Sequence, residues 1–372
     1  MVKLLFVSLL IGFSFAQAGE VSGALDGKRL IETEPGKSVW MNDEQIANLS
    51  ARGHESGKCP GFVDITDHQQ SIEAQFTPSI DWTKRSLSHG VEVAGMISKV
   101  SSTRMFDRVT KLESYQNRYY MGKTGVESTQ WLKTVFAELS AGRSDVSIRE
   151  VKHKFDQPSL VVTLQGKGPH KDEILVVGGH LDSISGWWGG ASARAPGADD
   201  NASGVVTVLE VFNVLMENAF QSDRTIEFML YAGEEKGLLG SQDIAQEYAK
   251  GGKKVEGVMQ FDMTMDGGEE NAITFMTDFT NAGLNTFLEK LTEEYLHVKW
   301  GTSQCGYGCS DHASWFKAGY ASSIPFESQF ETMHHRLHTE DDQSKYLNQE
   351  FGSEFAKLGL AFVLETHQDQ SF

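Results

Sequence analysis

The chain has 372 residues, and 51 acidic against 33 basic side chains give it a formal charge of −18. This balance argues against nucleic acid as a partner, because binding to phosphates requires a basic surface and the sequence has no run of Lys or Arg. The length and the 40% hydrophobic content suffice for one large domain with a full core, plus an additional segment.

The first 18 residues read as a secretory signal peptide. Lys3 supplies the positive start, Leu4 to Phe15 is a short apolar run, and Ala16-Gln17-Ala18 is a small-x-small cleavage site. The run is too short to span a bilayer, and the sequence holds no other run that is long enough. We therefore expect a secreted protein with no membrane partner.

Residues 19–80 differ in composition from the rest of the chain. They are polar, with scattered charges, and contain one short helical candidate from Asn42 to Ala51. We interpret them as a pro-segment or N-terminal extension, and a small subdomain packed on the core is the alternative. Residues 81–372 then form the main domain.

Three cysteines are consistent with export. Cys305 and Cys309 lie in Cys-Gly-Tyr-Gly-Cys, whose glycines allow a tight loop, and an oxidising compartment favours a disulfide there. Cys59 is left without a partner.

Strand and helix patterns alternate along the main domain, which predicts an α/β fold with a mostly parallel central sheet flanked by helices. Helical periodicity dominates residues 91–139, and residues 205–220 read as a buried helix. Residues 146–155 and 160–164 read as neighbouring strands. Further strands are predicted at 174–179, 225–231, 255–261, 273–277 and 321–326, and further helices at 238–250, 284–295 and 345–367.

Acidic and imidazole side chains follow the first buried strand of this pattern. His180 and Asp182 stand at its carboxyl end, and they share a face because strand residues two apart point the same way. Asp182 can therefore orient the His180 ring, as carboxylates do for metal-bound histidines. Asp199 and Asp200 follow in a glycine-flanked turn. The alternative is an ordinary strand end with a capping acid.

Later strand ends add more acids. Glu234 and Glu235 end one strand, Asp262 ends the next, and His338 lies in a late acidic loop. Taken singly, each could be a solvated turn or plain surface. Together they would gather at one edge of the sheet, where ligands bind in open α/β folds. Imidazole and carboxylate ligands without thiolate suit zinc, or cobalt and manganese as substitutes.

These residues carry a resemblance to the secreted bacterial dizinc leucyl aminopeptidases, which share the zinc exopeptidase fold. The matching stretches run in the family's order over about residues 85–368. They are Gly179 to Ser183, Pro196 to Gly204, Glu234 to Ser241, Gln260 to Thr264, Cys305 to Trp315, Pro325 to Ser328 and His338-Thr339.

The resemblance implies a catalytic site with two zinc ions bridged by Asp200. His180 and Asp262 would complete one metal site, and Glu235 and His338 the other. Glu234 would be the general base, Asp182 the partner of His180, and Tyr307 a group that helps to hold the oxyanion. The family also implies a cis peptide between Asp200 and Asn201.

The implied substrates are peptides with a free N-terminus, with preference for Leu, Met and Phe, and we expect a monomer. By family position an apolar pocket would hold the first side chain of the substrate. Besides Tyr307, its wall would consist of Met263, Met276, Cys305, Cys309, Ile324, Phe326, Phe330, Met333 and Leu337.

Three alternatives remain open. A glutaminyl cyclase of the same fold would bind a single zinc, a related carboxypeptidase would require a free C-terminus, and a binding domain would have lost its ligands. The chain also departs from the family at two places: the loop from Ile184 to Ala195, with Trp187 and Trp188, and the strip of His334 and His335, which could bind an extra metal.

Overall fold

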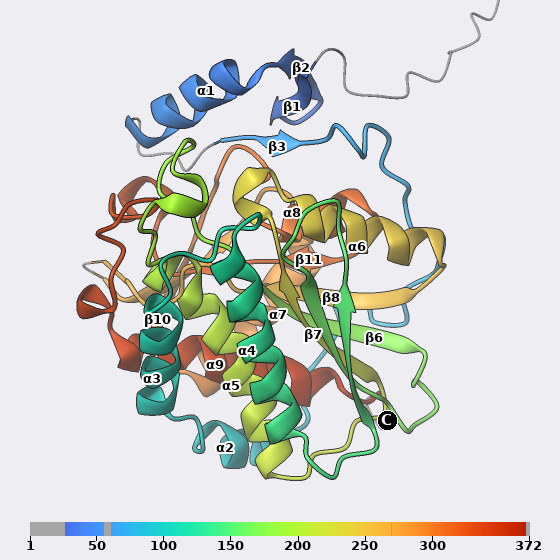
Figure 1. Ribbon diagram of the computed structural model, residues 1–372. Helices are drawn as coiled ribbons and strands as arrows, with labels where there is room; N and C mark the ends of the chain where they lie inside the picture. The colour runs from blue at the N-terminus through green and yellow to red at the C-terminus, as the bar shows by residue number, and fades with distance from the viewer. Residues whose placement is uncertain (1–26, 56–60, 269, 370–372) are drawn as a thin grey trace, which may run out of the picture.

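The computed structural model describes residues 27–55, 61–268 and 270–369, so the predictions for the signal peptide and for Cys59 lie outside the described residues. A six-stranded sheet in the order β11-β8-β6-β7-β5-β4 forms its centre (Figure 1). Its strands are β4 (Val146–Val151), β5 (Ser159–Leu164), β6 (Glu173–His180), β7 (Thr225–Tyr231), β8 (Lys254–Gln260) and β11 (Ser322–Ser323).

The parallel part of this sheet brings several strand ends to one edge. Strands β11, β8, β6 and β7 run parallel, whereas β5 and β4 are antiparallel to their neighbours. In register, His180 stands opposite Tyr231, and Gly178 opposite Gln260. The residues that follow β6, β7 and β8 therefore leave the sheet side by side, as the sequence pattern predicts.

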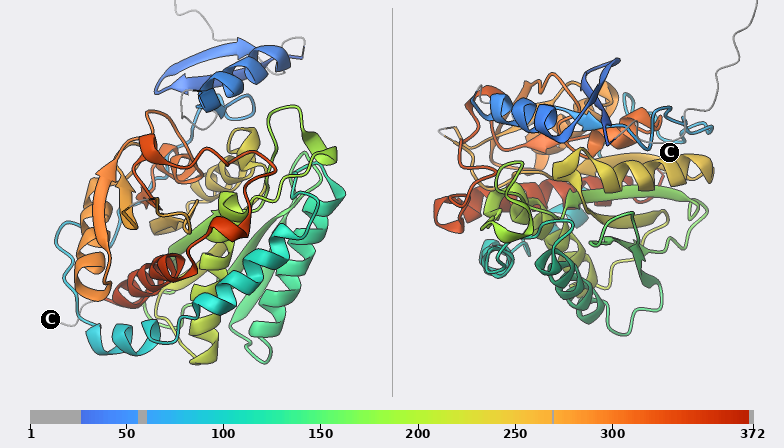
Figure 2. Two further views of the ribbon diagram at one scale, coloured as in Figure 1. Left: turned by 90° about the vertical axis from the view of Figure 1, so that its left-hand side faces the viewer. Right: turned by 45° about the horizontal axis from the view of Figure 1, so that its top comes forward.

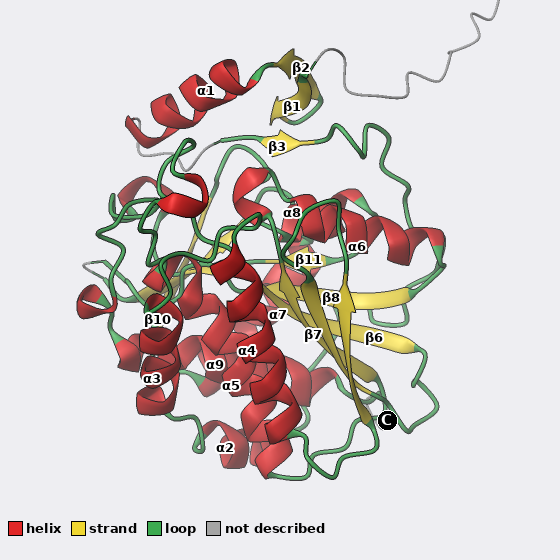
Figure 3. Ribbon diagram, in the orientation of Figure 1, coloured by secondary structure: helices red, strands yellow, loops and turns green. Residues whose placement is uncertain are grey.

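Helices cover both faces of the central sheet (Figure 3). Helices α6 and α8 pack on one face, and the core of the other face contains side chains of α2, α3, α4, α5, α7 and α9. Their bounds are α2 (Gly90–Ile97), α3 (Ser102–Glu113), α4 (Lys123–Leu139), α5 (Gly204–Glu217), α6 (Leu239–Lys250), α7 (Ala282–Tyr295), α8 (His312–Lys317) and α9 (Gln349–Thr366). This confirms the predicted α/β fold and its flanking helices.

Helix α5 lies at the centre of the larger core. Its residues 204–216 are all buried, which agrees with the nearly uniform apolar character from which the buried helix was predicted. Because α5 begins directly after the turn that holds Asp200, the packing of this helix fixes the position of that turn.

The strand predicted at 321–326 is in fact two short strands in different sheets. Ser322 and Ser323 pair with β8 in the central sheet, whereas β12 (Pro325–Phe326) pairs with β9 (Ala272–Met276). Pro325 cannot donate a ladder hydrogen bond, which makes it a natural point to change partners. With β10 (Lys299–Ser303) the second sheet has the order β10-β9-β12.

Residues 27–55 and 61–64, here called the N-terminal unit, form a small separate layer above the main domain (Figure 2). It consists of β1 (Arg29–Glu34), β2 (Lys37–Met41), α1 (Asp43–Glu55) and β3 (Val63–Asp64), with a core of Ile31, Ile46 and Phe62. The predicted helix is present, but the β1–β2 hairpin was not predicted. Its turn contains Pro35 and Gly36, and Gly36 takes a positive φ of 72°.

Across the described ranges, no helix combines the length and apolar character required to cross a membrane.

Candidate active site

Asp200 lies between two imidazoles. Its Oδ1 is 3.1 Å from Nε2 of His180, and its Oδ2 is 2.9 Å from Nε2 of His338. The same nitrogen of His180 is 3.2 Å from Oδ1 of Asp262, and that of His338 is 2.6 Å from Oε2 of Glu235. The five predicted ligands thus form two groups that share Asp200, and within each group the ligand atoms lie within 4.8 Å of one another.

The central sheet positions three of these ligands. His180 is the last residue of β6, Asp262 follows the end of β8, and Glu235 lies in a 3₁₀ turn after β7. That turn is enclosed by Gly233 and Gly237, with φ of 74° and 104°, a conformation that glycine adopts without a side-chain clash. The ligands come from separate strand ends because a parallel sheet brings those ends to one edge.

The turn that holds Asp200 is tied to its surroundings by hydrogen bonds. The peptide between Asp200 and Asn201 is cis, as the family resemblance implies. The amide of Asn201 donates to the carbonyl of Phe261 at 2.9 Å and accepts from the N–H of Met263 at 3.2 Å. Asn201 therefore joins the bridging turn to the end of β8.

Two further side chains hold this region, and neither was predicted from the sequence. The carboxylate of Asp342 accepts the backbone N–H groups of Asp199 and Asp200 at 2.9 and 3.0 Å. The buried guanidinium of Arg118 donates to the carbonyls of Leu181, Pro196 and Gly197. Neither residue lies in a recognisable local motif, because both act on backbone groups far away in the sequence.

Asp182 lies beside His180 and holds the backbone of both glutamates. Its Oδ1 lies 3.8 Å from Nδ1 of His180, an ion-pair distance longer than a hydrogen bond. Its two oxygens accept the N–H groups of Glu234 and Glu235 at 3.0 and 3.2 Å. Asp182, which was predicted to orient His180, thus makes its hydrogen bonds to the turn that carries Glu234.

The buried acids of the site strongly perturb one another. Burial and the neighbouring carboxylate of Asp200 raise the pKa of Glu235 to about 7. Burial raises the pKa of Glu234 well above its ordinary value, and Asp311, Asp262 and Glu235 add to this effect. Burial disfavours a charge on His180, but the surrounding carboxylates outweigh it and raise its pKa. Such a cluster requires protons or cations to balance its negative charge.

Two atoms of the ligands lack hydrogen-bond partners among the described residues. They are Nδ1 of His180 and Oε1 of Glu235, and both are buried. An unpaired buried polar atom is costly. Nδ1 of His180 faces Asp182 and not the ligand group. The fit to a pair of divalent cations of the zinc type therefore rests on the orphaned Oε1 of Glu235 and on the imidazole–carboxylate ligand set.

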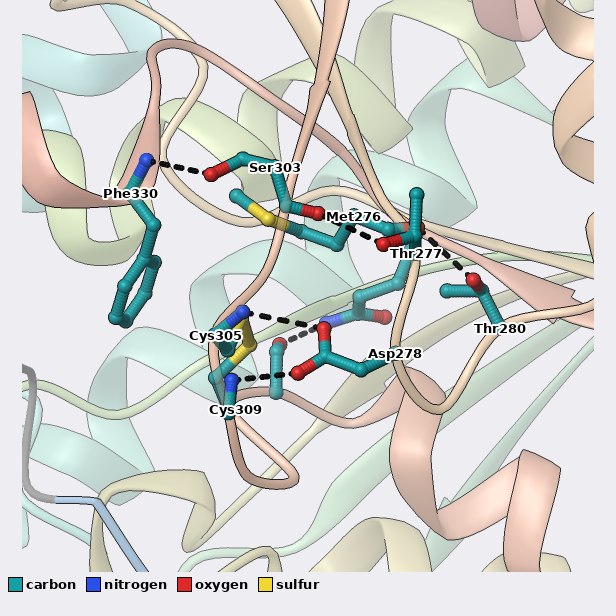
Figure 4. Close-up of a disulfide and its surroundings, with 11 residues drawn as sticks. Met276, Thr277, Asp278, Thr280, Ser303, Cys305, Cys309 and Phe330 are labelled. Atoms are coloured by element: carbon teal, nitrogen blue, oxygen red, sulfur yellow. Dashed lines mark hydrogen bonds between the residues drawn. A yellow bond between two sulfur atoms is a disulfide. The ribbon is translucent and has the colours of Figure 1, made fainter.

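An apolar pocket adjoins this centre. The cavity in front of Asp200, Glu234, Asp262 and His338 is bounded by apolar side chains. The whole predicted wall comes together in one buried cluster, with Cys309 at its margin: Met263, Met276, Cys305, Tyr307, Ile324, Phe326, Phe330, Met333 and Leu337. Cys305 and Cys309 form the predicted disulfide (Figure 4).

His334 and His335 have different surroundings. Nε2 of His334 lies 3.0 Å from Oδ2 of Asp199, and with Glu327 these residues form a third group of possible ligands. His335 is exposed and joins no such group within the described part of the chain. Asp199 thus ties His334 to the turn of the bridging Asp200.

The N-terminal unit reaches the entrance of the site. Phe62 lines a cavity together with Glu234, Glu235 and Tyr307. Its ring contacts the ring of Trp187, with centroids 5.7 Å apart. The ammonium of Lys236 lies 3.6 Å from the centroid of Trp187 and donates to its carbonyl. The unmatched tryptophan loop is therefore one contact between the unit and the turn of Glu234 and Glu235, and the N–H of Asp64 makes another when it donates to the carbonyl of Gly237 at 3.2 Å.

Comparison with known proteins assigns this arrangement to a family. The sequence profile of peptidase family M28 matches residues 159–363. This chain belongs to peptidase family M28. Leucine aminopeptidase 1 of Fusarium vanettenii is 36% identical to this M28 chain, covering 94% of it and 90% of the relative. Leucine aminopeptidase 1 of Trichophyton equinum is 37% identical, covering 91% and 92%.

Solved structures agree with this assignment. The Legionella pneumophila LapA aminopeptidase has a TM-score of 0.80 and 28% identity, covering 92% of the M28 chain and 99% of its own. Glutaminyl cyclase of Fimbriiglobus ruber has a TM-score of 0.58 at 17% identity, covering 72% and 96%, and so shares the fold alone. The prediction of a metallo-aminopeptidase is thereby confirmed. The leucine aminopeptidases named here are fungal, whereas the resemblance was to bacterial enzymes.

Proposed function

We propose that this protein is a secreted, monomeric aminopeptidase that removes Leu and other apolar residues from the N-terminus of peptides by means of two bridged zinc ions. The observation that carries the proposal is the position of Asp200, which gives one carboxylate oxygen to each of two ligand groups. His180 and Asp262 would hold one ion, and Glu235 and His338 the other. Cobalt or manganese would serve as substitutes.

The bound ions would supply Lewis acidity for the scissile carbonyl and lower the pKa of a coordinated water toward about 7, the value that enzyme-bound zinc can produce. Glu234 lines the cavity beside the ligands, which supports a role as general base: its carboxylate would accept the proton of the attacking water and return it to the leaving amine. Asp182 holds Glu234 in place through its backbone N–H. Tyr307 would donate a hydrogen bond to the oxyanion.

The apolar cluster next to this centre favours Leu, Met and Phe as the first residue of the substrate. Its wall contains Met263, Met276 and Met333, whose flexible side chains adapt to different apolar groups. A charged side chain would lose its hydration there without gaining a partner. The names of the fungal leucine aminopeptidases and the family support this preference.

The second ligand group favours a peptidase over a glutaminyl cyclase. A cyclase with one zinc needs only one set of ligands, whereas Asp200 here completes two. The presence of all five ligands and Glu234 likewise favours an enzyme over a binding domain.

We further propose that residues 1–18 direct export and that residues 19–80 form a pro-segment. Phe62 of the N-terminal unit lies in the cavity of Glu234, Glu235 and Tyr307, so removal of the unit would widen the access to the metal centre. N-terminal sequencing of the active secreted protein should give a start near residue 81. An active form that begins at Gly19 would contradict the pro-segment.

Zinc content and leucine release test the main proposal together. We expect about two zinc ions per chain and release of free leucine from a Leu-peptide, but not from its N-acetylated form. Activity should disappear with a chelator and return with added zinc. One zinc per chain without peptide hydrolysis would instead indicate a cyclase, and faster cleavage of Lys- or Asp-terminal peptides would contradict the apolar preference.

A further inference from the structure

The loop of residues 304–309 carries Tyr307 to the active site. The disulfide between Cys305 and Cys309 closes this loop, and Gly306 takes a positive φ of 84°. Gly308 packs closely, since a side-chain carbon there would lie 3.0 Å from atoms of Ala313 and Val63. The disulfide restrains the two ends of the loop relative to each other, but it does not fix the loop against the sheet.

Asp278 supplies that second attachment (Figure 4). Its Oδ1 accepts the backbone N–H of Cys305 at 3.1 Å, and its Oδ2 accepts that of Gly306 at 2.5 Å. Both bonds are charge-assisted, which makes them stronger than bonds between neutral groups. The two N–H groups directly precede Tyr307, so the carboxylate holds the backbone at the point where this side chain emerges.

The turn that carries Asp278 is itself fixed to the second sheet. The N–H of Thr277 donates to the carbonyl of Ser303 at 3.0 Å. The carbonyl of Met276, the last residue of β9, accepts from the side chains of Thr280 and Asn285 at 2.9 and 2.8 Å. A carboxylate on such a turn can restrain the loop because its own position is restrained.

We propose that Asp278 is a positioning residue for the aminopeptidase reaction, acting through Tyr307. By holding the N–H groups of Cys305 and Gly306, it keeps the Tyr307 side chain in the cavity that also contains Glu234 and Glu235. Oxyanion donors must be preorganised because their contribution depends on geometry that is set before the reaction. This inference rests on the proposed function, which gives Tyr307 its role.

A double-mutant cycle tests the inference. Tyr307→Phe should lower kcat by about 10²-fold, the usual loss for one oxyanion donor. Asp278→Ala should lower kcat by about tenfold, with KM changed less than kcat. In the double variant, Asp278→Ala should add almost nothing to the loss from Tyr307→Phe, because residues that act through one another are not additive. Asp278→Asn retains one acceptor and should fall between Asp278→Ala and the wild type.

Control measurements distinguish a loss of Tyr307 positioning from a general loss of folding or zinc binding. Asp81→Ala removes a carboxylate that also accepts a backbone N–H, that of Thr83, in an exposed turn, and should leave kcat unchanged. Zinc content and thermal unfolding should be close to those of the wild type for Asp278→Asn. The inference would be overturned if Asp278→Ala lowered kcat by the same factor in the wild type and in Tyr307→Phe. It would also be overturned if Asp278→Ala left the kcat of the wild type unchanged.

Hydrogen exchange gives a readout that does not depend on activity. Amide exchange of residues 305 and 306 should be at least tenfold faster in Asp278→Asn than in the wild type, and unchanged exchange would overturn the proposed attachment. If the wild type binds zinc but releases no leucine, the proposed function fails and the catalytic part of the inference fails with it. Faster exchange in the variant would then still show that Asp278 holds the loop.

Discussion

Two carboxylates in this protein each lie between two imidazoles, yet their surroundings differ. Asp200 bridges His180 and His338, and its side chain is 5% exposed. Asp243 in α6 contacts Nε2 of His68 at 2.8 Å and Nδ1 of His153 at 2.7 Å, and its side chain is 38% exposed. The first bridge joins strand ends, and the second joins the segment after the N-terminal unit to the main domain.

The difference lies in the acids around each bridge. Asp262 and Glu235 add a further carboxylate to each imidazole at Asp200, which leaves a buried excess of negative charge. At Asp243, the other nitrogen of His153 instead contacts the neutral hydroxyl of Ser159 at 2.7 Å. The described residues show no three-ligand group that contains Asp243. A carboxylate between two imidazoles therefore indicates a metal site only when burial and additional acids accompany it.

Exchange of the two bridging acids for their amides is the strongest test of this comparison. Asp200→Asn should abolish activity and lower zinc from about two ions per chain to one or fewer, because an amide nitrogen does not bind zinc. Asp243→Asn should retain zinc content and activity. Elemental analysis and leucine release measure both. Loss of zinc from Asp243→Asn would show that the distinction is wrong.

Glu234 extends the comparison to an acid that lies beside the bridge at Asp200. We propose it as the general base and not as a metal ligand. Glu234→Ala should lower kcat by about 10²–10⁴-fold, the range for a general acid–base residue. Its zinc content should remain normal, as determined on the same sample. A variant that keeps most of its activity would exclude the proposed role as base.

His312 tests the effect of burial on an imidazole that has no bridging acid. Burial lowers its pKa to about 3, so the unfolded chain takes up a proton below about pH 6.5 while the folded protein does not. As the pH falls from about 6.5 toward 3, the histidine should cost up to about 1.4 kcal/mol of stability per pH unit. Urea unfolding between pH 7 and 4.5 should show a loss of stability that is steeper in the wild type than in His312→Gln by this amount, while His367, whose pKa burial lowers to about 4, contributes equally to both.

Exposed His297 provides a matched control for that series. His297→Gln should follow the pH dependence of the wild type. Parallel slopes for the wild type and His312→Gln would contradict the assigned pKa.

The smallest effect is expected at the second bridge. Asp243→Asn should lower the free energy of unfolding by about 0.5–1.5 kcal/mol, the usual net value of a hydrogen bond. The contacts with His153 and His68 hold the pKa of Asp243 below its ordinary value despite burial. The stabilisation is thus present at neutral pH, and the difference between wild type and variant should shrink as the pH falls below about 4. Thermal unfolding at pH 7 and pH 3.5 measures it, and a difference that grows toward acid would refute this reasoning.

The candidate metal ligands could be predicted from the sequence, but the residues that hold them in place could not. His180, Glu235 and Asp262 were predictable because they follow apolar strands, whose ends a parallel sheet brings together. Arg118, Asp278 and Asp342 bind backbone groups of distant segments, and no local pattern marks such contacts. The β1–β2 hairpin was missed because its short strands mix polar and apolar residues without a regular alternation, and only Ile31 among them is fully buried. The change of sheet after Ser323 depends on tertiary pairing.

The two borders of the central sheet bear on how the protein behaves at high concentration. An open border is a template on which another chain can add a strand and begin aggregation. Strand β11 spans only Ser322 and Ser323, too short to seed such growth, and β4 at the opposite border carries the charges of Arg149 and Glu150. Neither border of the central sheet therefore favours the addition of a strand from a second molecule.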